Sequence, residues 1–313
     1  MKVFDINKDF EELSENFEIN NSSFWIVTKV DDINKLVNKF SLDNESVLEC
    51  ISKGSKPCKI IFYDGYMFLT LNVLQLINEK IQCKELNIYL SSNYIITLYK
   101  DNISIIDELF LDIKNLKNCF ILKNKPKPAY VLYYIIDRII VNNYDIISKL
   151  ESDADKIEIA ILKKPRQEHA DTLIHLRRQV YKIRKNLYPL RYIGDSLVSN
   201  ENQIIEKEDI KYFKSINDKI SKLMLALENL VSDLALVREA FESEIANKTN
   251  DLMKIFTIIT SIFLPLNLFT SMQGMNYKKI PFVDYEYGYY FTVVIMILIA
   301  VGLLFIFKKK KWI

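Results

Sequence analysis

The side chains whose spacing could do chemistry follow one face of an uncharged segment, residues 255–277, near the C-terminal end. Steps of three or four residues trace one face of an α-helix. On this face lie Ser271, Asn267, Leu264, Thr260, Phe256 and Met253. Three of these six side chains carry a hydroxyl or an amide. Such groups are costly against lipid, so the pattern predicts a face that contacts water.

Two alternatives stay open for this face. The hydroxyls of Thr260 and Ser271 could bond to carbonyls of their own helix or to a neighbouring helix. Phe256 and Met253 could simply contact lipid. Asn267 is harder to explain in either way, because its amide is less easily hidden.

Enzyme chemistry has few residues to use in this chain. There are 2 histidines, His169 and His175, and 6 glycines that form no phosphate-binding loop. None of the 4 cysteines shows the C-x-x-C spacing of a metal site or redox pair. The net charge of +2 gives no basic face for general nucleic-acid binding. We therefore predict neither an enzyme nor a nucleic-acid binder.

Two segments are long and apolar enough to cross a lipid bilayer. Residues 255–277 and 287–307 contain no charged residue, and each reaches the about 20 residues that a spanning helix needs. A pair of buried core helices is the alternative. We predict a transmembrane hairpin with spans at 253–277 and 287–307, joined by a loop at 278–286.

The charged flanks of the spans predict the orientation. Residues 308–313 form a basic tail that contains Lys308, Lys309, Lys310 and Lys311. Lysine-rich flanks favour the cytoplasmic side, and two spans return the chain to its starting side. Residues 1–13 lack the apolar core of a signal peptide. We expect a multi-pass protein of the plasma (inner) membrane with both termini in the cytoplasm.

Residues 1–122 have the pattern of an α/β domain. Residues 32–50 have helical spacing, and the β-rich runs lie at 24–30, 60–62, 66–72, 86–90 and 94–99. The pattern predicts at least four strands in a mixed or antiparallel sheet.

Residues 123–252 are predicted to be a linker followed by helices. The linker at 123–128 precedes helical patterns at 129–161 and 169–191, and then a heptad seam. The seam consists of Phe213, Ile216, Ile220, Leu223, Leu227, Leu230, Leu234, Val237 and Phe241. We expect the seam to pack within its own domain. Whether other subunits also pack against it stays open. Because no Pro or Gly lies between Gly194 and Pro265, one helix is expected to continue from this stalk into the first span.

The first span ends in Gly274, Met275 and Asn276, after a Phe-Leu-Pro-Leu run at 263–266. A short loop, a second span and the tail KKKKWI follow. This arrangement resembles the CorA-type magnesium transport family, whose hallmark is Gly-Met-Asn at the end of the first of two C-terminal spans. Segments at 24–27, 48–49, 57–60, 66–73, 88–98 and 137–144 are similar to the family's cytoplasmic segments, so the resemblance covers nearly the whole chain.

The resemblance implies a funnel-shaped homopentamer with a cytoplasmic α/β domain and a stalk helix that continues as the pore helix. Gly274, Met275 and Asn276 would form a ring at the outer mouth. Gly274 would let the backbone turn with a positive φ, or approach another backbone closely, at the helix end. Mg²⁺ would be the transported and regulatory ion, without any resident cofactor. Mg²⁺ dehydrates reluctantly, and neutral Asn276 amides could accept hydrogen bonds from its waters without holding the ion too tightly. At the cytoplasmic end, Phe256 and Met253 suit an apolar gate that closes by dewetting.

A regulatory Mg²⁺ site would require oxygen ligands from neighbouring subunits. Asp218, Glu239 and Glu242 on the stalk are candidates, although solvated surface carboxylates are the ordinary interpretation. The four tail lysines suit a basic collar around the cytoplasmic mouth, or anchoring to lipid headgroups.

Two departures from the family pattern concern ion selection. Gln273 stands where Tyr is common. The family's loop commonly has an acidic residue directly after its Pro, whereas here Phe282 follows Pro281 and the acidic loop residues are Asp284 and Glu286. Met275 favours Mg²⁺, because zinc-transporting relatives often have Val or Ile there. A transporter of Co²⁺, Ni²⁺ or Zn²⁺ with the same fold and a membrane-tethered sensor or scaffold are the alternatives.

Overall fold

The computed structural model describes residues 1–14, 17, 22–52, 54, 56–115, 117–276 and 285–312. It contains two compact units. The first comprises Met1–Ala160 and Arg166–Arg238, and the second comprises Ile161–Pro165 and Glu239–Ile313.

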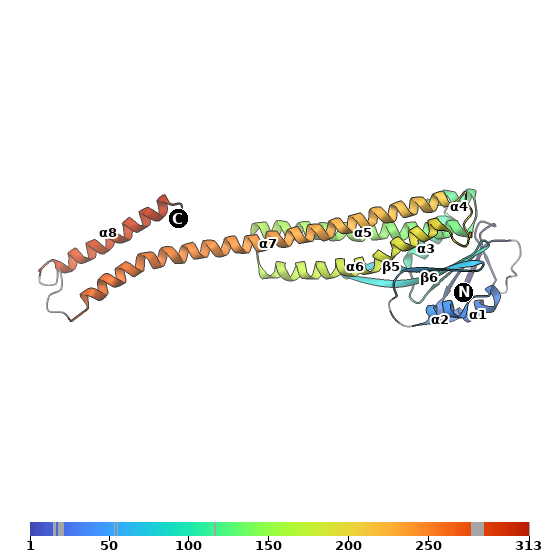
Figure 1. Cartoon of the computed structure of the whole chain (residues 1–313), viewed down its shortest axis with the longest axis horizontal. Helices are drawn as coiled ribbons and strands as arrows, with labels where there is room; N and C mark the ends of the chain where they lie inside the picture. The colour runs from blue at the N-terminus through green and yellow to red at the C-terminus, as the bar shows by residue number, and fades with distance from the viewer. Residues whose placement is uncertain are drawn as a thin grey trace. The chain divides into compact units, whose positions relative to one another are not determined.

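A seven-stranded mixed sheet forms the centre of the first unit (Figure 1). Its order is β2 (Glu11–Leu13), β1 (Lys2–Asp5), β3 (Phe24–Lys29), β7 (Tyr94–Tyr99), β6 (Lys80–Leu90), β5 (Tyr66–Ile77) and β4 (Lys59–Tyr63). Only the β3–β7 pair is parallel, with Phe24 opposite Tyr94, and the other pairs are antiparallel. The sequence predicts at least four strands in a mixed or antiparallel sheet, and the sheet is mixed. The sequence patterns missed β1 and β2, which are only 4 and 3 residues long.

Short helices cover one face of this sheet. They include α1 (Asn34–Phe40) and α2 (Asn44–Ile51), which follow the 3-10 turn η1 (Val30–Asp32). Leu36 and Val47 from these helices join Phe68 and Ile96 of the sheet in one buried cluster. Asp43 caps α2 by accepting a hydrogen bond from the Glu45 amide at 2.8 Å. Two further short helices, α3 (Ser104–Lys114) and α4 (Phe120–Asn124), lead to the long helices.

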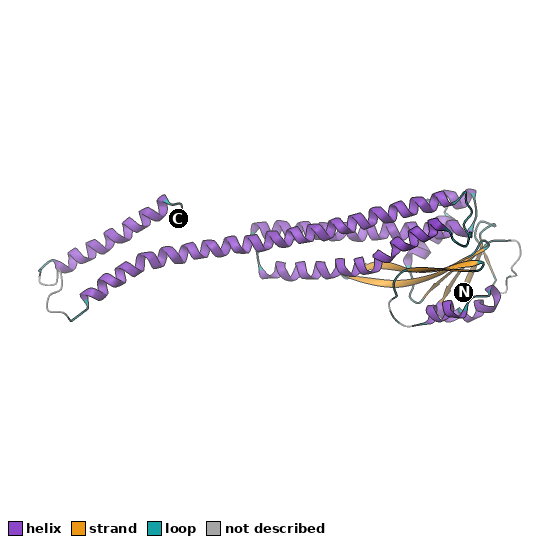
Figure 2. Ribbon diagram, viewed as in Figure 1, coloured by secondary structure: helices purple, strands orange, loops and turns teal. Residues whose placement is uncertain are grey.

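Three long helices complete the first unit, and two of them, α5 and α7, continue beyond it. They are α5 (Pro128–Lys163), α6 (Gln167–Ser199) and α7 (Ile210–Gln273), drawn as the long coils in Figure 2. α6 packs on β4, β5 and β6. It passes through Pro189 and ends eight residues beyond the expected end at 191. The missing hydrogen bond at Pro189 is tolerated, because Leu190, Ile193 and Leu197 on the far side are buried.

The heptad seam on α7 is buried inside the chain. Its residues from Phe213 to Val237 are at most 8% exposed. α5 covers it where Tyr133 meets Phe213 with ring centroids 6.4 Å apart. α6 approaches so closely that a Cβ on Gly194 would lie 2.4 Å from Asn217 Oδ1. This part of the seam is therefore an intrachain interface, and it cannot also hold other subunits together.

The second unit contains the end of α7 and α8 (Gly288–Lys309). Both helices are long and apolar enough to cross a membrane, with mean hydropathy of 1.8 and 2.9 over their most apolar stretches. They pair through a hydrogen bond of 3.0 Å from Gln273 Nε2 to Thr292 Oγ1. The predicted loop residues Lys278, Lys279 and Asp284 lie outside the described residues.

Candidate functional site

The predicted polar face of α7 lies away from α8. In this part of α7 the side chains that are not exposed are buried Ile258 and half-buried Ser261, Ile262, Pro265, Leu266, Phe269 and Gln273, and Gln273 bonds to Thr292 of α8. At 3.6 residues per turn, this covered face is roughly opposite the predicted stripe. Every member of that stripe is exposed: Met253, Phe256, Thr260, Leu264, Asn267 and Ser271. The hairpin therefore leaves polar groups uncovered in a segment suited to lipid.

The polar groups of this face differ in what they bond to. Thr260 Oγ1 donates to its own helix, at 2.8 Å from the Phe256 carbonyl oxygen and 3.1 Å from that of Thr257. The back-bonding alternative thus describes the Thr260 hydroxyl. Among the described residues, the side chains of Asn267 and Ser271 make no hydrogen bond. These two groups are the ones that require water or another partner.

The Gly-Met-Asn segment closes the C-terminal end of α7. The Gly274 amide donates to the Thr270 carbonyl at 3.0 Å, and Asn276 lies beyond the last helical turn with an exposed side chain. The free carbonyls of a helix C-terminus carry partial negative charge, which favours nearby cations. Asn276 therefore lies where a cation is attracted without a carboxylate.

Gly274 does not have the left-handed backbone that would explain a glycine here. Its φ lies outside the positive range, and an added Cβ would meet the Ser271 and Thr270 carbonyl oxygens at 3.7 Å, an ordinary contact. A turn with positive φ is therefore not the reason for this glycine. Close approach of another backbone remains the prediction.

The predicted regulatory carboxylates do not converge within one chain. Asp218, Glu239 and Glu242 are all exposed on α7. Asp218 and Glu239 are separated by about 30 Å along the helix axis at 1.5 Å per residue. In the described part of the chain, no group of three or more His, Cys, Asp or Glu side chains could hold a metal ion. Any regulatory site on these residues would need a second copy.

The tail lysines lie at the end of α8. Lys308 and Lys309 occupy the last turn of the helix, Lys310 caps it, and Lys311 follows with φ of 55°. All four side chains are exposed. Positive charge at a helix C-terminus is favourable, so helix capping is one role that needs no other subunit.

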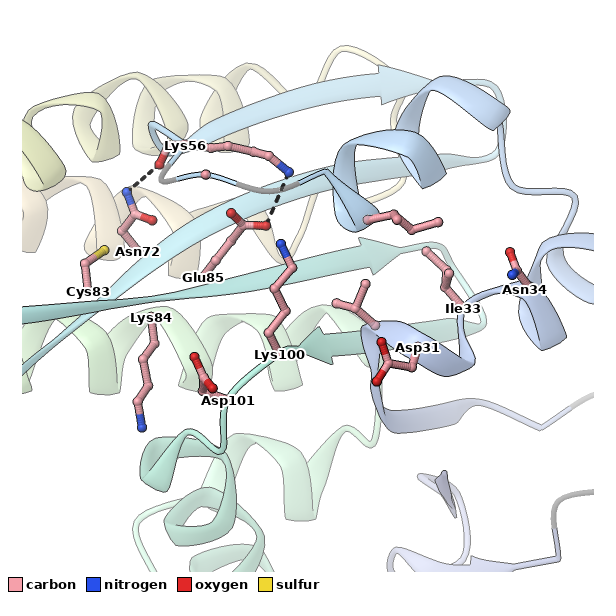
Figure 3. A pocket seen from close by; sticks show the side chains of 13 residues that line it. Asp31, Ile33, Asn34, Lys56, Asn72, Cys83, Lys84, Glu85, Lys100 and Asp101 are labelled. Carbon is pink, nitrogen blue, oxygen red and sulfur yellow. Dashed lines mark hydrogen bonds and ion pairs between the residues drawn. The ribbon is translucent and has the colours of Figure 1, made fainter.

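The first unit contains a pocket of about 700 Å³ that sequence patterns did not indicate (Figure 3). Three lysines line it, but each amine has a partner. Lys100 Nζ donates to the Ser52 carbonyl at 2.8 Å, and Lys84 Nζ donates to that of Asn102 at 2.6 Å. Lys56 Nζ lies 3.5 Å from Glu85 Oε1, with the dashed line between them in Figure 3. Lys100 thus bonds to the end of α2, and Lys56 pairs with Glu85 on β6. Both are structural roles.

The thiols of the first unit are unsuited to catalysis. All four cysteines are free, and Cys83 lines the pocket. Burial raises the pKa of Cys50 and Cys83 to about 11 and that of Cys58 to about 12. A thiol protonated at neutral pH is a poor nucleophile and a poor metal ligand.

Comparison with known proteins identifies the family. The model of the CorA-like Mg²⁺ transporter protein family matches residues 20–309, nearly the whole chain. The chain belongs to this family. The cobalt/magnesium transport protein CorA of Thermotoga maritima is 27% identical to it over 283 residues, which cover 90% of this chain and 80% of that protein.

Solved structures of the CorA family share the fold. The complete CorA magnesium transporter of Methanocaldococcus jannaschii matches with a TM-score of 0.85 and 21% identity, covering 100% of this chain and 98% of that one. The full-length CmaX protein matches with a TM-score of 0.75 and 18% identity, covering 99% of this chain and 97% of that one. The soluble α/β domain, the long helix and the two candidate spans are therefore the CorA architecture.

Proposed function

We propose that this CorA-family divalent-cation transporter is a gated homopentameric channel that carries Mg²⁺ across the plasma membrane into the cytoplasm. In this arrangement the ends of five α7 helices line the pore, and α8 lies outside them. One observation carries the proposal. One face of this part of α7 is partly buried, and on the opposite face the side chains of Asn267 and Ser271 make no hydrogen bond to the described residues, in a segment suited to lipid. A central water-filled pore would hydrate those groups.

The outer mouth would be the ring of Gly274, Met275 and Asn276. Asn276 amide oxygens from five copies would accept hydrogen bonds from the waters of Mg²⁺, and the α7 C-termini would add negative potential. Neutral amides bind a hydrated divalent ion weakly enough to release it. The exposed backbone at Gly274 would let the copies approach closely.

The cytoplasmic end of the pore would hold the gate. Leu264, Phe256 and Met253 present apolar side chains on the same face as Asn267, and Thr260 adds no free hydroxyl donor because it bonds to its own helix. A narrow apolar stretch stops ions by expelling water. Mg²⁺ bound between copies by Asp218, Glu239 and Glu242 would favour the closed state, and the lysines at 308–311 would surround the mouth.

The names of relatives leave the choice of ion to experiment. The Thermotoga relative is named for both cobalt and magnesium. The cytoplasmic domain of ZntB from Vibrio parahaemolyticus shares the fold of the first unit, with a TM-score of 0.66 and 13% identity over 79% of this chain and 98% of that domain. Uptake of Mg²⁺, Co²⁺, Ni²⁺ and Zn²⁺ into the same vesicles would rank them. A tethered sensor or scaffold would carry none of the four.

Asn276→Ala tests the site. We expect it to abolish Mg²⁺ uptake into vesicles while leaving the pentamer intact, because the methyl group cannot orient the waters of the ion. Asn229→Ala changes an equally exposed asparagine of α7 within the first unit and should transport normally. Particle mass in mild detergent checks assembly. Normal uptake by an assembled Asn276→Ala protein would show that this ring does not select the ion.

A further inference from the structure

The C-terminal tail is held in a defined turn at the end of α8. The Trp312 amide donates to the Phe307 carbonyl at 3.1 Å, and the Lys311 amide donates to that of Lys308 at 3.1 Å. With Lys311 in the left-handed conformation at φ 55°, these two bonds form a Schellman motif. Its usual apolar contact is also present, because the Trp312 and Phe307 rings stack with centroids 5.8 Å apart. The turn therefore places Trp312 rather than leaving it free.

Trp312 forms one wall of a pocket within the second unit. The cavity is about 520 Å³, and α7 supplies its remaining lining, which consists of Asn247, Asn250, Asp251, Met253, Lys254 and Thr257. Lys254 is the last charged residue before the uncharged stretch of α7, and Lys308 is the first after that of α8. If these helices cross a bilayer, the pocket lies at the level of the lipid headgroups.

The chemistry of this pocket is that of an anion site with an apolar side. Lys254 Nζ lies 2.8 Å from Asp251 Oδ1, so these two charges largely cancel. Lys308 to Lys311, which do not line the pocket, contribute four exposed ammonium groups in the tail just before Trp312. The Asn250 amide and the Trp312 indole are further donors. The Trp312 ring supplies apolar surface toward the spans.

We infer that this pocket binds the phosphate headgroup of an anionic phospholipid in the leaflet next to the tail. The phosphate would lie between Lys254 and the tail lysines, and the acyl chains would follow the Trp312 ring into the bilayer. Lysines near a membrane surface attract anionic lipid, and tryptophan prefers the same depth. Free phosphate would be attracted by the lysines but would not gain the contact with the apolar side of the pocket. The inference rests on the membrane hairpin and is independent of ion conduction.

Trp312 fluorescence provides the test. The chain has 2 tryptophans, and Trp25 is fully buried in the first unit, so a quencher in the bilayer reports on Trp312. The full chain is reconstituted in phosphatidylcholine vesicles with an equal mole fraction of brominated phosphatidylglycerol or brominated phosphatidylcholine. We expect stronger quenching by the brominated phosphatidylglycerol, unchanged by millimolar inorganic phosphate. Equal quenching by the two lipids, no quenching by either, or competition by phosphate would overturn the inference.

Three variants separate the pocket from general attraction to the tail. Lys254→Ala should weaken the preference for phosphatidylglycerol about fivefold, and Asp251→Asn should strengthen it by removing a repulsive charge. Lys248→Ala, an exposed lysine of α7 outside the pocket, should leave it unchanged. A preference that survives Lys254→Ala and disappears only when the four tail lysines are replaced by glutamine would show that the pocket is not the site.

Discussion

The two ends of α7 have the same helical geometry but opposite environments. In the first unit, Leu223 and Leu230 are fully buried between neighbouring helices of the same chain. In the second unit, Phe256 is 62% exposed and Leu264 is 74% exposed. The first unit therefore covers its apolar surface by itself, as a soluble domain does. The second unit depends on lipid, and in our proposal on four other copies.

One polar group from each unit shows a similar difference in whether the chain itself supplies its hydrogen-bond partners. In the first unit, the buried carboxylate of Asp209 accepts hydrogen bonds from Tyr130 Oη at 2.6 Å and Lys127 Nζ at 3.0 Å. In the second unit, the amide of Asn267 has no partner among the described residues. A buried charge such as that of Asp209 needs partners within the chain, although the buried Asn143 amide of the same unit makes no hydrogen bond to the described residues; a pore-lining group can be left to water.

Paired leucine substitutions on α7 should show the largest difference in stability between the two units. Leu223→Ala creates a cavity between buried helices and should cost about 2–5 kcal/mol. Leu264→Ala removes an exposed side chain and should leave the first unit unchanged. Thermal unfolding followed by the fluorescence of buried Trp25 measures both. Equal losses would mean that the two halves of α7 belong to one cooperative structure.

A pair of glycine substitutions should have a smaller effect of the same kind. Gly194→Ala places a Cβ 2.4 Å from Asn217 Oδ1 and 3.0 Å from Ile220 Cδ1, which should cost about 1–3 kcal/mol through overpacking. Gly302→Ala in α8 meets nothing within 4 Å and is the matched control. The same unfolding measurement applies. A stable Gly194→Ala protein would show that the Asn217 and Ile220 side chains can move aside without loss of stability.

Acid should weaken the first unit through Asp209. Burial raises the pKa of this carboxyl, but the hydrogen bonds from Tyr130 and Lys127 and the charge of Lys125 outweigh burial and lower it below its ordinary value. The unfolded chain therefore takes up this proton first as the pH falls. The stabilisation that ionised Asp209 contributes is complete above the ordinary carboxyl pKa of about 3.9. It is lost as the pH falls through the lower pKa of Asp209 in the folded protein.

Tyr130→Phe removes one of those hydrogen bonds. It should cost about 1.5–3 kcal/mol at neutral pH, as bonds to charged groups do. It should also reduce the loss of stability between pH 5 and pH 3, a range that brackets the ordinary pKa of about 3.9. Unfolding measured across that range checks both effects. An unchanged pH profile would assign the acid sensitivity to other carboxyls.

Mg²⁺ should produce the smallest stability effect, because it would act only between copies. Excess Mg²⁺ should raise the melting temperature of the assembled protein by about 2–4 °C for each kcal/mol of binding and should slow proteolysis of the first unit. Asp218→Asn should reduce both effects if this carboxylate is a ligand. The same digestion pattern in chelator and in millimolar Mg²⁺ would argue against regulation of this kind.

The sequence by itself determined the features that depend on local composition. Uncharged stretches long enough to cross a bilayer require only hydropathy to recognise, and both appear as helices. The heptad from Phe213 to Val237 likewise shows which face of α7 is buried. The Gly-Met-Asn segment indicated the family before any fold was known. The site residues remain predictions, because neither one chain nor its relatives tests them.

The tertiary structure decided which partner covers each face. Periodicity shows that the seam of α7 is apolar, but only the packing of Tyr133 and Gly194 shows that α5 and α6 of the same chain cover it. Likewise, the residue type of Gly274 suggested a positive φ that the backbone does not have. The turn at the end of α8 places Trp312 in the same pocket as Lys254, although the two residues lie 58 positions apart in the sequence. Such contacts depend on the three-dimensional path of the chain, which local sequence patterns do not contain.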